Sequence, residues 1–309
     1  MKSIKAAGVI GAGVIGSGWV ARLLLNGIDV FVYDPSKEAP KYVNKVIDNA
    51  ERAYKKLLTS NLPKKGKLLF SGSISEVAKS CELIIEAVPE RLSIKQSAYE
   101  EIESSADKNL VIASSTSGIL PSDLQAKMKH PERLLVAHPF NPVYLLPLVE
   151  IVGGSKTSKN VIEETSKKFT NIGMFPLHIK KEIPAFIADR LLESVWREAL
   201  WLVNDDIATT EEIDDAIRYG FGLRWAQMGL FETYRLAGGE AGMRHFISQF
   251  GPCLEWPWTH LMDVPEFTDE LIEKVSSQSD QQSGQFSIDE LMEKRDDNLV
   301  DFLKVLKDN

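Results

Sequence analysis

Apolar and polar positions follow two alternating patterns over roughly the first 180 residues. Short apolar runs typical of buried strands are separated by longer stretches with helical spacing, such as Val14–Leu25 and the charged Ser36–Thr59. The predicted strands are Ile4–Ile10, Ile28–Tyr33, Lys67–Phe70, Leu83–Val88, Leu110–Ala113, Leu134–Ala137, Leu148–Val152 and Met174–Ile179. This alternation predicts an α/β domain with a mostly parallel, doubly wound sheet and helices on both faces.

The pattern changes after Lys180-Lys181, and the remainder has helical spacing only. Pro184 is expected near the start of a long amphipathic helix that runs to about Val203, since proline suits the first helical turn. Thr209 with Glu212, and Ser287 with Glu290, have the spacing of capping boxes that open two further helices. We therefore predict two domains: an α/β domain over residues 1–181 and an all-α domain over residues 182–309.

A glycine-rich turn, Gly11-Ala12-Gly13-Val14-Ile15-Gly16, directly follows the first predicted strand. In such a strand–turn–helix unit the first glycine allows a tight turn. The second lets the backbone approach a pyrophosphate, and the third lets the helix pack on the strand. Asp34 ends the second predicted strand, where a carboxylate accepts hydrogen bonds from ribose hydroxyls and repels a 2′-phosphate. These residues predict a Rossmann-type domain that binds NAD in preference to NADP.

Composition and charge exclude some function classes. The chain is 44% hydrophobic and 26% charged, as is usual for a globular protein, and its net charge is −8. Residues 1–180 carry 24 basic and 18 acidic side chains, whereas residues 181–309 carry 12 and 26. The acidic half is either a solvated helical surface or a field that attracts a cationic substrate. No basic face alternates with aromatic residues, so we do not expect nucleic-acid binding.

Cysteine usage and hydropathy predict a cytoplasmic protein. Cys81 and Cys253 are too few for a disulfide framework and indicate reduced thiols. The segment Met1-Lys2-Ser3 leads directly into the first predicted strand, unlike a secretory signal peptide. No apolar run approaches the ~20 residues that a membrane span requires. We therefore expect no membrane association, and we predict no metal ion in the site.

His138 is the candidate general base. It ends a predicted strand, at the carboxyl edge where open α/β sheets bind ligands. Oxidation of an alcohol needs a group that takes the hydroxyl proton, and histidine suits this role because it titrates near neutral pH. Glu150 lies within the next apolar strand, where a carboxylate is costly unless it has a partner. The pattern fits a His–Glu pair and fits equally well a strand carboxylate that faces water.

Several segments resemble the L-3-hydroxyacyl-CoA dehydrogenase family. They are His138-Pro139-Phe140-Asn141-Pro142 with Leu148-Val149-Glu150, Ala113-Ser114-Ser115-Thr116-Ser117, Glu86-Ala87-Val88-Pro89-Glu90 with Lys95, and Ile183–Leu191. The family counterparts are H-F-F-N-P…L-V-E, S-N-T-S, E-A-x-x-E…K and P-G-F-x-x-N-R-L. These segments lie between residues 86 and 191 at spacings that agree with the family pattern, so the chain is identified as a member of this family.

The resemblance implies catalytic roles for three residues. His138 is the base, Glu150 orients it and stabilises the imidazolium, and Ser117 hydrogen-bonds the substrate oxygen. Replacement of the family asparagine by Asp189 and of the family glycine by Ala185 puts an acyl-CoA substrate in doubt. An aspartate donates no hydrogen bond unless it is protonated, so its role must differ from that of the asparagine.

The resemblance also implies cofactor contacts and an assembly. Glu90 and Lys95 are expected on the nicotinamide ribose side, and Asn141 is a further candidate cofactor contact. The helical domain is expected to form a homodimer.

The second half resembles the L-carnitine 3-dehydrogenase branch of this family. The segments concerned are Gly222–Gly229, Leu236–Phe246, Gly251-Pro252 and Pro257-Trp258-Thr259. The resemblance implies NAD-dependent oxidation of the 3-hydroxyl of L-carnitine to 3-dehydrocarnitine. A trimethylammonium group donates no hydrogen bonds and is held by aromatic faces and negative charge. The candidate substrate residues are Phe140, Tyr144, Trp196, Trp225 and Asp189.

Three alternatives remain open. The chain oxidises L-gulonate, or a 3-hydroxyacyl-CoA, or it is a non-catalytic NAD-binding protein like a lambda-crystallin. A CoA substrate needs a basic groove for its phosphates. Lysines that can form one, or can equally be solvated, are Lys55, Lys56, Lys64, Lys65 and Lys67.

Overall fold

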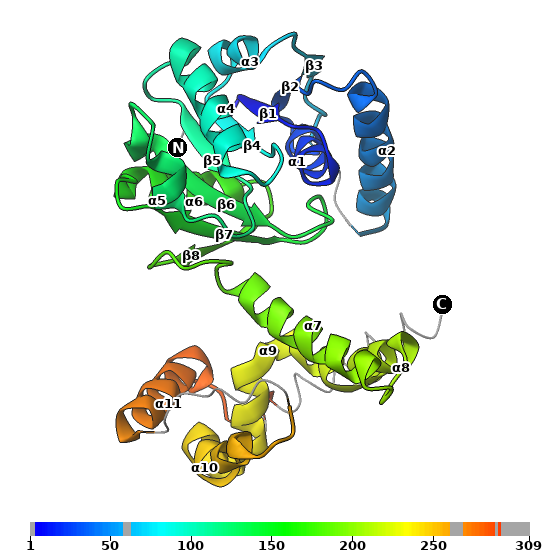
Figure 1. The fold of residues 1–309 in the computed structure, drawn as a ribbon, viewed down its shortest axis with the longest axis vertical. Coiled ribbons are helices and arrows are strands. Elements are labelled where there is room, and N and C mark those ends of the chain that lie inside the picture. The colour runs from blue at the N-terminus through cyan, green and yellow to red at the C-terminus, as the bar shows by residue number, and fades with distance from the viewer. Residues whose placement is uncertain (1–3, 58–62, 260–267, 288–289, 292–309) are drawn as a thin grey trace. The chain divides into compact units, whose positions relative to one another are not determined.

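The computed structural model describes residues 4–57, 63–259, 268–287 and 290–291. The chain divides into two compact units, residues 1–190 and 191–309. Each unit is described by itself, with the element labels of Figure 1. The domain boundary predicted after residue 181 stays a prediction.

An eight-stranded sheet forms the centre of the first unit, in the order β3-β2-β1-β4-β5-β6-β7-β8. Its strands are β1 (Ala6–Ile10), β2 (Asp29–Tyr33), β3 (Leu68–Phe70), β4 (Leu83–Glu86), β5 (Val111–Ser114), β6 (Leu134–Pro139), β7 (Leu148–Gly153) and β8 (Phe175–Ile179). All neighbouring strands are parallel except β6 and β7, which pair antiparallel. The predicted mostly parallel, Rossmann-type sheet is therefore confirmed.

Helices cover both faces of this sheet (Figure 1). They are α1 (Val14–Leu25), α2 (Ala39–Leu57), α3 (Ile74–Ser80), α4 (Leu92–Ser105), α5 (Pro121–Gln125) and α6 (Lys159–Thr170). One hydrophobic core contains side chains of α1, α2 and α6, and the other contains side chains of α3, α4 and α5. Successive residues of the central strands contribute to the two cores in turn, as the period of two in a strand requires.

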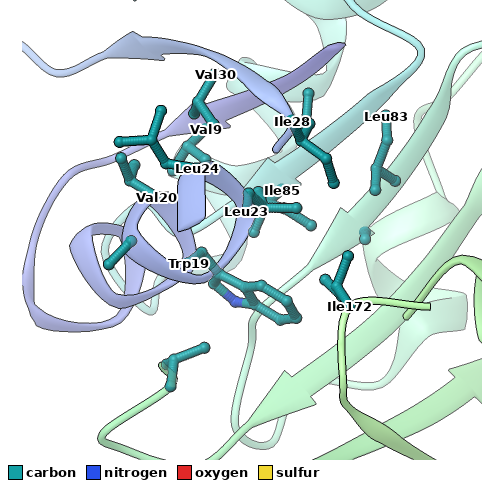
Figure 2. Close-up of a cluster of buried hydrophobic side chains, with 14 of the residues drawn as sticks. Val9, Trp19, Val20, Leu23, Leu24, Ile28, Val30, Leu83, Ile85 and Ile172 are labelled. Carbon is teal, nitrogen blue, oxygen red and sulfur yellow. The ribbon is translucent and has the colours of Figure 1, made fainter. Parts of the chain in front are cut away.

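The core beneath α1 explains why this helix has almost no polar surface. Trp19, Leu23 and Leu24 are fully buried, and they belong to the same cluster as Val9 of β1 and Ile85 of β4. Figure 2 shows these side chains together between the helix and the sheet. Because α1 is fixed on the strands in this way, its N-terminus is held at the carboxyl edge of β1, where the glycine-rich turn lies.

Arg22 is a buried cation on the inner face of α1, only 3% exposed. Its guanidinium donates to four backbone carbonyls, those of Val143 at 2.6 Å, Leu146 at 3.0 Å, Ile172 at 3.1 Å and Gly173 at 3.3 Å. Burial lowers the pKa of Arg22, although the planar group keeps its charge at neutral pH. The contacts fasten the loop that follows β6 to the rest of the unit.

The long helix predicted from Pro184 begins later, because α7 covers Ala188–Asn204. Ala185 and Phe186 have φ angles of 59° and 51°, in the left-handed region that a helix cannot include. They form a turn that the Phe186 N–H closes by donating to the Ile183 carbonyl at 3.3 Å. The proline therefore precedes a turn rather than the first turn of the helix.

The second unit contains helices and no strand among its described residues. Besides α7, its helices are α8 (Thr210–Ala216), α9 (Gly222–Ala237), α10 (Gly242–Phe250) and α11 (Asp269–Ser283), with short helical turns between them. Thr209 and Glu212 form the predicted capping box, and Ser287 and Glu290 exchange the same pair of hydrogen bonds. The predicted all-α C-terminal domain is confirmed. None of the described helices has the length and apolar character needed to cross a bilayer.

Candidate active site

His138 and Glu150 lie opposite each other on the antiparallel strands β6 and β7. Directly opposed residues point to the same face of a sheet, so their side chains meet. The His138 Nδ1 atom is 2.8 Å from Glu150 Oε2, and the two side chains are 5% and 0% exposed. The interpretation in which this carboxylate faces water does not hold, since Glu150 is fully buried.

The turn before α7 supplies the other partners of Glu150. Its Oε1 atom accepts the backbone N–H groups of Ile187 at 3.0 Å and Ala188 at 2.9 Å. A carboxylate held by three donors has a fixed position and provides a strong, charge-assisted hydrogen bond. Facing Nδ1, it favours the tautomer with a proton on that atom, which leaves His138 Nε2 to accept a proton.

The Nε2 atom of the imidazole faces Asp189, and two aromatic rings lie close to the His138 ring. Asp189 Oδ2 is 3.6 Å from Nε2, and its side chain is 22% exposed. The Phe140 ring centroid is 5.1 Å from that of His138, and the Phe186 centroid is 5.6 Å away. Two carboxylates on opposite sides of a buried ring stabilise a positive charge on it by Coulomb attraction.

A cleft of about 740 Å³ lies along the glycine-rich turn, between Tyr33 and Asp34 on one side and residues of α4 on the other. Gly11 has a φ of +89°, and a Cβ at Gly16 would lie 1.8 Å from the Gly11 carbonyl oxygen. A Cβ at Gly13 would meet nothing within 4 Å, so this backbone is open to a ligand. The turn therefore fits a dinucleotide, whose phosphates the first N–H groups of α1 would receive.

The Asp34 carboxylate is held in place by two backbone N–H groups, one of which belongs to the glycine-rich turn. Its Oδ2 atom accepts the Ala12 N–H at 2.7 Å, and its Oδ1 atom accepts the Ser36 N–H at 2.8 Å. Each carboxylate oxygen has a second lone pair, so both remain able to accept hydrogen bonds from ribose hydroxyls.

Glu90 follows Pro89, which lines this cleft, and forms an ion pair with Lys95, with 3.1 Å between Glu90 Oε2 and Lys95 Nζ. The Glu90 side chain is 46% exposed, whereas that of Lys95 is 1% exposed. Glu90 Oε1 accepts the Thr116 hydroxyl and the Ser117 N–H, the latter at 3.1 Å. Burial alone would raise the pKa of Glu90, but the Thr116 hydrogen bond and the Lys95 charge outweigh it and lower the pKa.

The remaining predicted residues are more scattered. Ser117 and Asn141 are exposed, beyond the carboxyl ends of β5 and β6. Tyr144 packs against the core that contains α1. Trp196 and Trp225 belong to α7 and α9 of the helical unit, where Trp225 contacts Phe221 with ring centroids 4.6 Å apart. Their contact with a substrate stays a prediction.

The sequence matches two family models. The match to the 3-hydroxyacyl-CoA dehydrogenase NAD binding domain covers residues 6–183, and the match to the C-terminal domain of the same enzymes covers residues 186–265. The chain belongs to the 3-hydroxyacyl-CoA dehydrogenase family. NAD is therefore its cofactor, and the chain is an NAD-dependent dehydrogenase.

Relatives within the 3-hydroxyacyl-CoA dehydrogenase family carry more specific names. The chain is 59% identical over 307 residues to an L-carnitine dehydrogenase of Mesorhizobium japonicum, covering 99% of this chain and 84% of that protein. It is 56% identical to an L-carnitine dehydrogenase/betainyl-CoA thioesterase of Rhizobium meliloti, covering 99% of this chain but only 62% of that protein. The chain thus spans less than two thirds of this second relative.

A solved structure has the same fold. It is 5-formyl-3-hydroxy-2-methylpyridine 4-carboxylic acid 5-dehydrogenase, an NAD⁺-dependent dismutase, with a TM-score of 0.76 and 27% identity. The similarity covers 98% of this chain and 99% of that one.

Sequence reasoning missed two features of this 3-hydroxyacyl-CoA dehydrogenase family site. Phe186, fully buried beside His138, was noted only as part of a helix start. Glu86 is fully buried at the end of β4. A signal for Glu86 was available: like Glu150, it is an acid in an apolar strand and therefore needs partners.

Proposed function

We propose that this chain oxidises the 3-hydroxyl group of L-carnitine to 3-dehydrocarnitine, with NAD as the hydride acceptor. The observation that carries the reaction type is the buried His138–Glu150 pair beside the carboxyl edge of a dinucleotide-binding sheet. The similarity over nearly the full chain to the L-carnitine dehydrogenase of Mesorhizobium japonicum supports the choice of substrate.

In this proposal the protein moves one proton. His138 Nε2 takes the proton of the substrate hydroxyl, and Glu150 stabilises the resulting imidazolium through Nδ1. Ser117 hydrogen-bonds the substrate oxygen while the C–H bond breaks. The chemistry that bound NAD supplies is acceptance of the hydride at its nicotinamide ring. The products are a ketone, the reduced cofactor and one proton, so charge and atoms balance.

The residues proposed to hold NAD lie along the cleft. The backbone of Gly11–Gly16 would receive the pyrophosphate, and Asp34 would accept the adenosine ribose hydroxyls. Glu90, with Lys95 behind it, and Asn141 are proposed for the nicotinamide end.

Asp189 is the proposed source of specificity for a cationic substrate. It lies 3.6 Å from the base on its proton-accepting side and is partly exposed. The trimethylammonium group of carnitine is two bonds from the reacting carbon, so it stays near the hydroxyl and can reach this carboxylate when the hydroxyl meets Nε2. Phe140, next to the base, would supply an aromatic face. The family asparagine provides no such charge.

A comparison of substrates tests this proposal. NADH formation is followed at 340 nm with L-carnitine, L-gulonate, a 3-hydroxyacyl-CoA and 3-hydroxy-5,5-dimethylhexanoate, in which a neutral tert-butyl group replaces trimethylammonium. We expect kcat/KM for L-carnitine to exceed that for the neutral isostere by roughly tenfold or more. In the variant Asp189→Asn this preference should shrink while KM for NAD is unchanged. A higher kcat/KM for L-gulonate or the acyl-CoA would refute the assignment.

We also propose that the helical domain forms a homodimer. Helix α7 has no buried residue among those described, and it exposes Leu191, Leu192, Trp196 and Leu200 by 52–57%. So many large apolar side chains on one helix are typical of an interface. Analytical ultracentrifugation should give twice the chain mass, and Trp196→Glu should shift the population toward monomer. A wild-type monomer at micromolar concentration would exclude the dimer.

A cytoplasmic location is proposed as well, on the basis of Cys81 and Cys253, which are both unpaired thiols.

A further inference from the structure

Glu86, at the end of β4, is a carboxylate whose acceptor sites are all occupied by protein donors, and it has no part in the chemistry described above. It is fully buried. Its Oε1 atom accepts Lys95 Nζ at 2.9 Å and the Val88 N–H at 2.9 Å. Its Oε2 atom accepts the Tyr99 hydroxyl at 2.5 Å and the Ser114 hydroxyl at 2.7 Å. A carboxylate offers about four acceptor sites, so Glu86 has none left for a ligand and acts only through its neighbours.

The Lys95 ammonium likewise has a protein partner for each of its hydrogen-bond donors. Its ammonium donates to Glu86 Oε1, to the Val88 carbonyl at 3.3 Å, and lies 3.1 Å from Glu90 Oε2. An ammonium has three donors, so all of them are used inside the protein. Lys95 therefore links the buried Glu86 to Glu90 and has no proton left to donate to a cofactor.

Glu90 is the exposed end of this chain of contacts. It follows directly after Pro89, which lines the nucleotide cleft, and the N–H of Ser117 points to it. The Thr116 hydroxyl that donates to Glu90 also accepts the Ile119 N–H at 3.1 Å. A dinucleotide that extends from Asp34 across the glycine-rich turn reaches this end of the cleft, because β1 and β4 are adjacent.

Of the three charged residues, Glu86 and Lys95 are buried and Glu90 is partly exposed. Glu86 and Lys95 form a buried, neutral pair, so the single negative charge left over is that of Glu90, which is half exposed. Without the charge of Glu86, the Lys95 ammonium would neutralise Glu90 instead. The charge that the cleft presents to a ligand is therefore set by a residue that no ligand touches.

We propose that Glu86 is a positioning and charge-setting residue for the nicotinamide end of the cofactor site. Through Lys95 it keeps the Glu90 carboxylate in place and negatively charged toward the cleft, which favours the cationic oxidised nicotinamide over the neutral reduced one. The same contacts fix the Thr116–Ser117 peptide. The placement of the nicotinamide beside Glu90 and the role of Ser117 both rest on the proposed function.

The test compares the affinities of the two cofactor forms for Glu86→Gln. NADH binding is measured by fluorescence titration and NAD⁺ binding by calorimetry, both without substrate. We expect the dissociation constant of NAD⁺ to rise about tenfold more than that of NADH, as for the loss of one charge several ångströms away. Because no substrate is present, failure of the carnitine proposal would leave this result unchanged.

Two further variants separate charge from structure. Glu103→Gln is the matched control, since Glu103 is a buried carboxylate on α4, the helix that carries Lys95, and it accepts the Lys129 and His130 N–H groups and pairs with Arg133. It should leave the NAD⁺/NADH affinity ratio unchanged. The double variant Glu86→Gln/Lys95→Met removes the neutral pair as a unit, so the ratio should return to the wild-type value.

The outcomes are distinct. Equal weakening of both cofactor forms by Glu86→Gln, or no recovery of the ratio in the double variant, would overturn the proposal. If Glu86→Gln alone does not fold, Lys95→Met replaces it and should shift the ratio in the opposite direction, toward NAD⁺. An unchanged ratio in that variant would also overturn the proposal.

Discussion

Replacement of Glu150 by glutamine measures the contribution of the buried carboxylate to proton transfer. The variant keeps the shape of the side chain but loses its charge, and only one oxygen remains for the three donors that now surround it. Charges about 4 Å apart attract by about 4 kcal/mol at an effective dielectric constant of about 20. If the imidazolium loses this stabilisation as it forms, turnover should fall by about 10³-fold.

The assay is kcat and KM for L-carnitine oxidation, with NADH affinity and thermal unfolding measured on the same protein. Glu182→Gln is the control, because Glu182 also accepts two hydrogen bonds, both from Ser122, and has no proposed role in catalysis. Its kinetics should match the wild type. A fall in kcat of less than about tenfold in folded Glu150→Gln would refute the role assigned to this carboxylate.

Three further predictions concern the cofactor site, the hydrogen bonds that Arg22 donates to backbone carbonyls, and the thiol of Cys81. Asp34→Ala removes the acceptor for ribose hydroxyls and the acceptor of the Ala12 N–H. The dissociation constant of NADH, measured by fluorescence titration, should therefore rise about tenfold or more. An unchanged dissociation constant would contradict this role of Asp34. Arg22→Met leaves four carbonyls without their donor. The free energy of unfolding, measured with urea, should fall by about 2–3 kcal/mol. An unchanged free energy of unfolding would show that these hydrogen bonds do not contribute to stability. Burial raises the pKa of Cys81 to about 12, so the thiol stays protonated below that pH and should resist iodoacetamide at pH 8 in the folded protein; rapid labelling there would contradict this.

The glycine-rich turn with Asp34 could be predicted from local sequence, and the contact between His138 and Glu150 was one of two interpretations that the sequence left open. The glycine-rich turn and Asp34 follow strands at fixed short spacings, and Glu150 is conspicuous as an acid among apolar residues. In each case the physical constraint acts within one strand–turn–helix unit or between neighbouring strands, so it leaves a pattern in the residues nearby.

The start of α7 and the partners of Glu86 were not predictable in this way. The left-handed turn at Ala185 and Phe186 directs two N–H groups to Glu150. Glu150 lies on β7, more than 30 residues earlier in the chain, so the sequence around the turn does not reveal why the turn forms. The partners of Glu86 lie on three separate segments, as distant as Ser114. Periodicity reports which face of an element is buried, but it does not report which polar groups meet there.

The most direct test of the central claim is the rate of hydride transfer in His138→Gln, measured in a single turnover with saturating NAD and L-carnitine by the appearance of NADH absorbance. The side chain remains polar and of similar size, but it cannot take up a proton. If His138 is the base, the rate should fall by roughly 10²–10⁴-fold while NADH still binds with nearly wild-type affinity. A single-turnover rate equal to that of the wild type would contradict the claim.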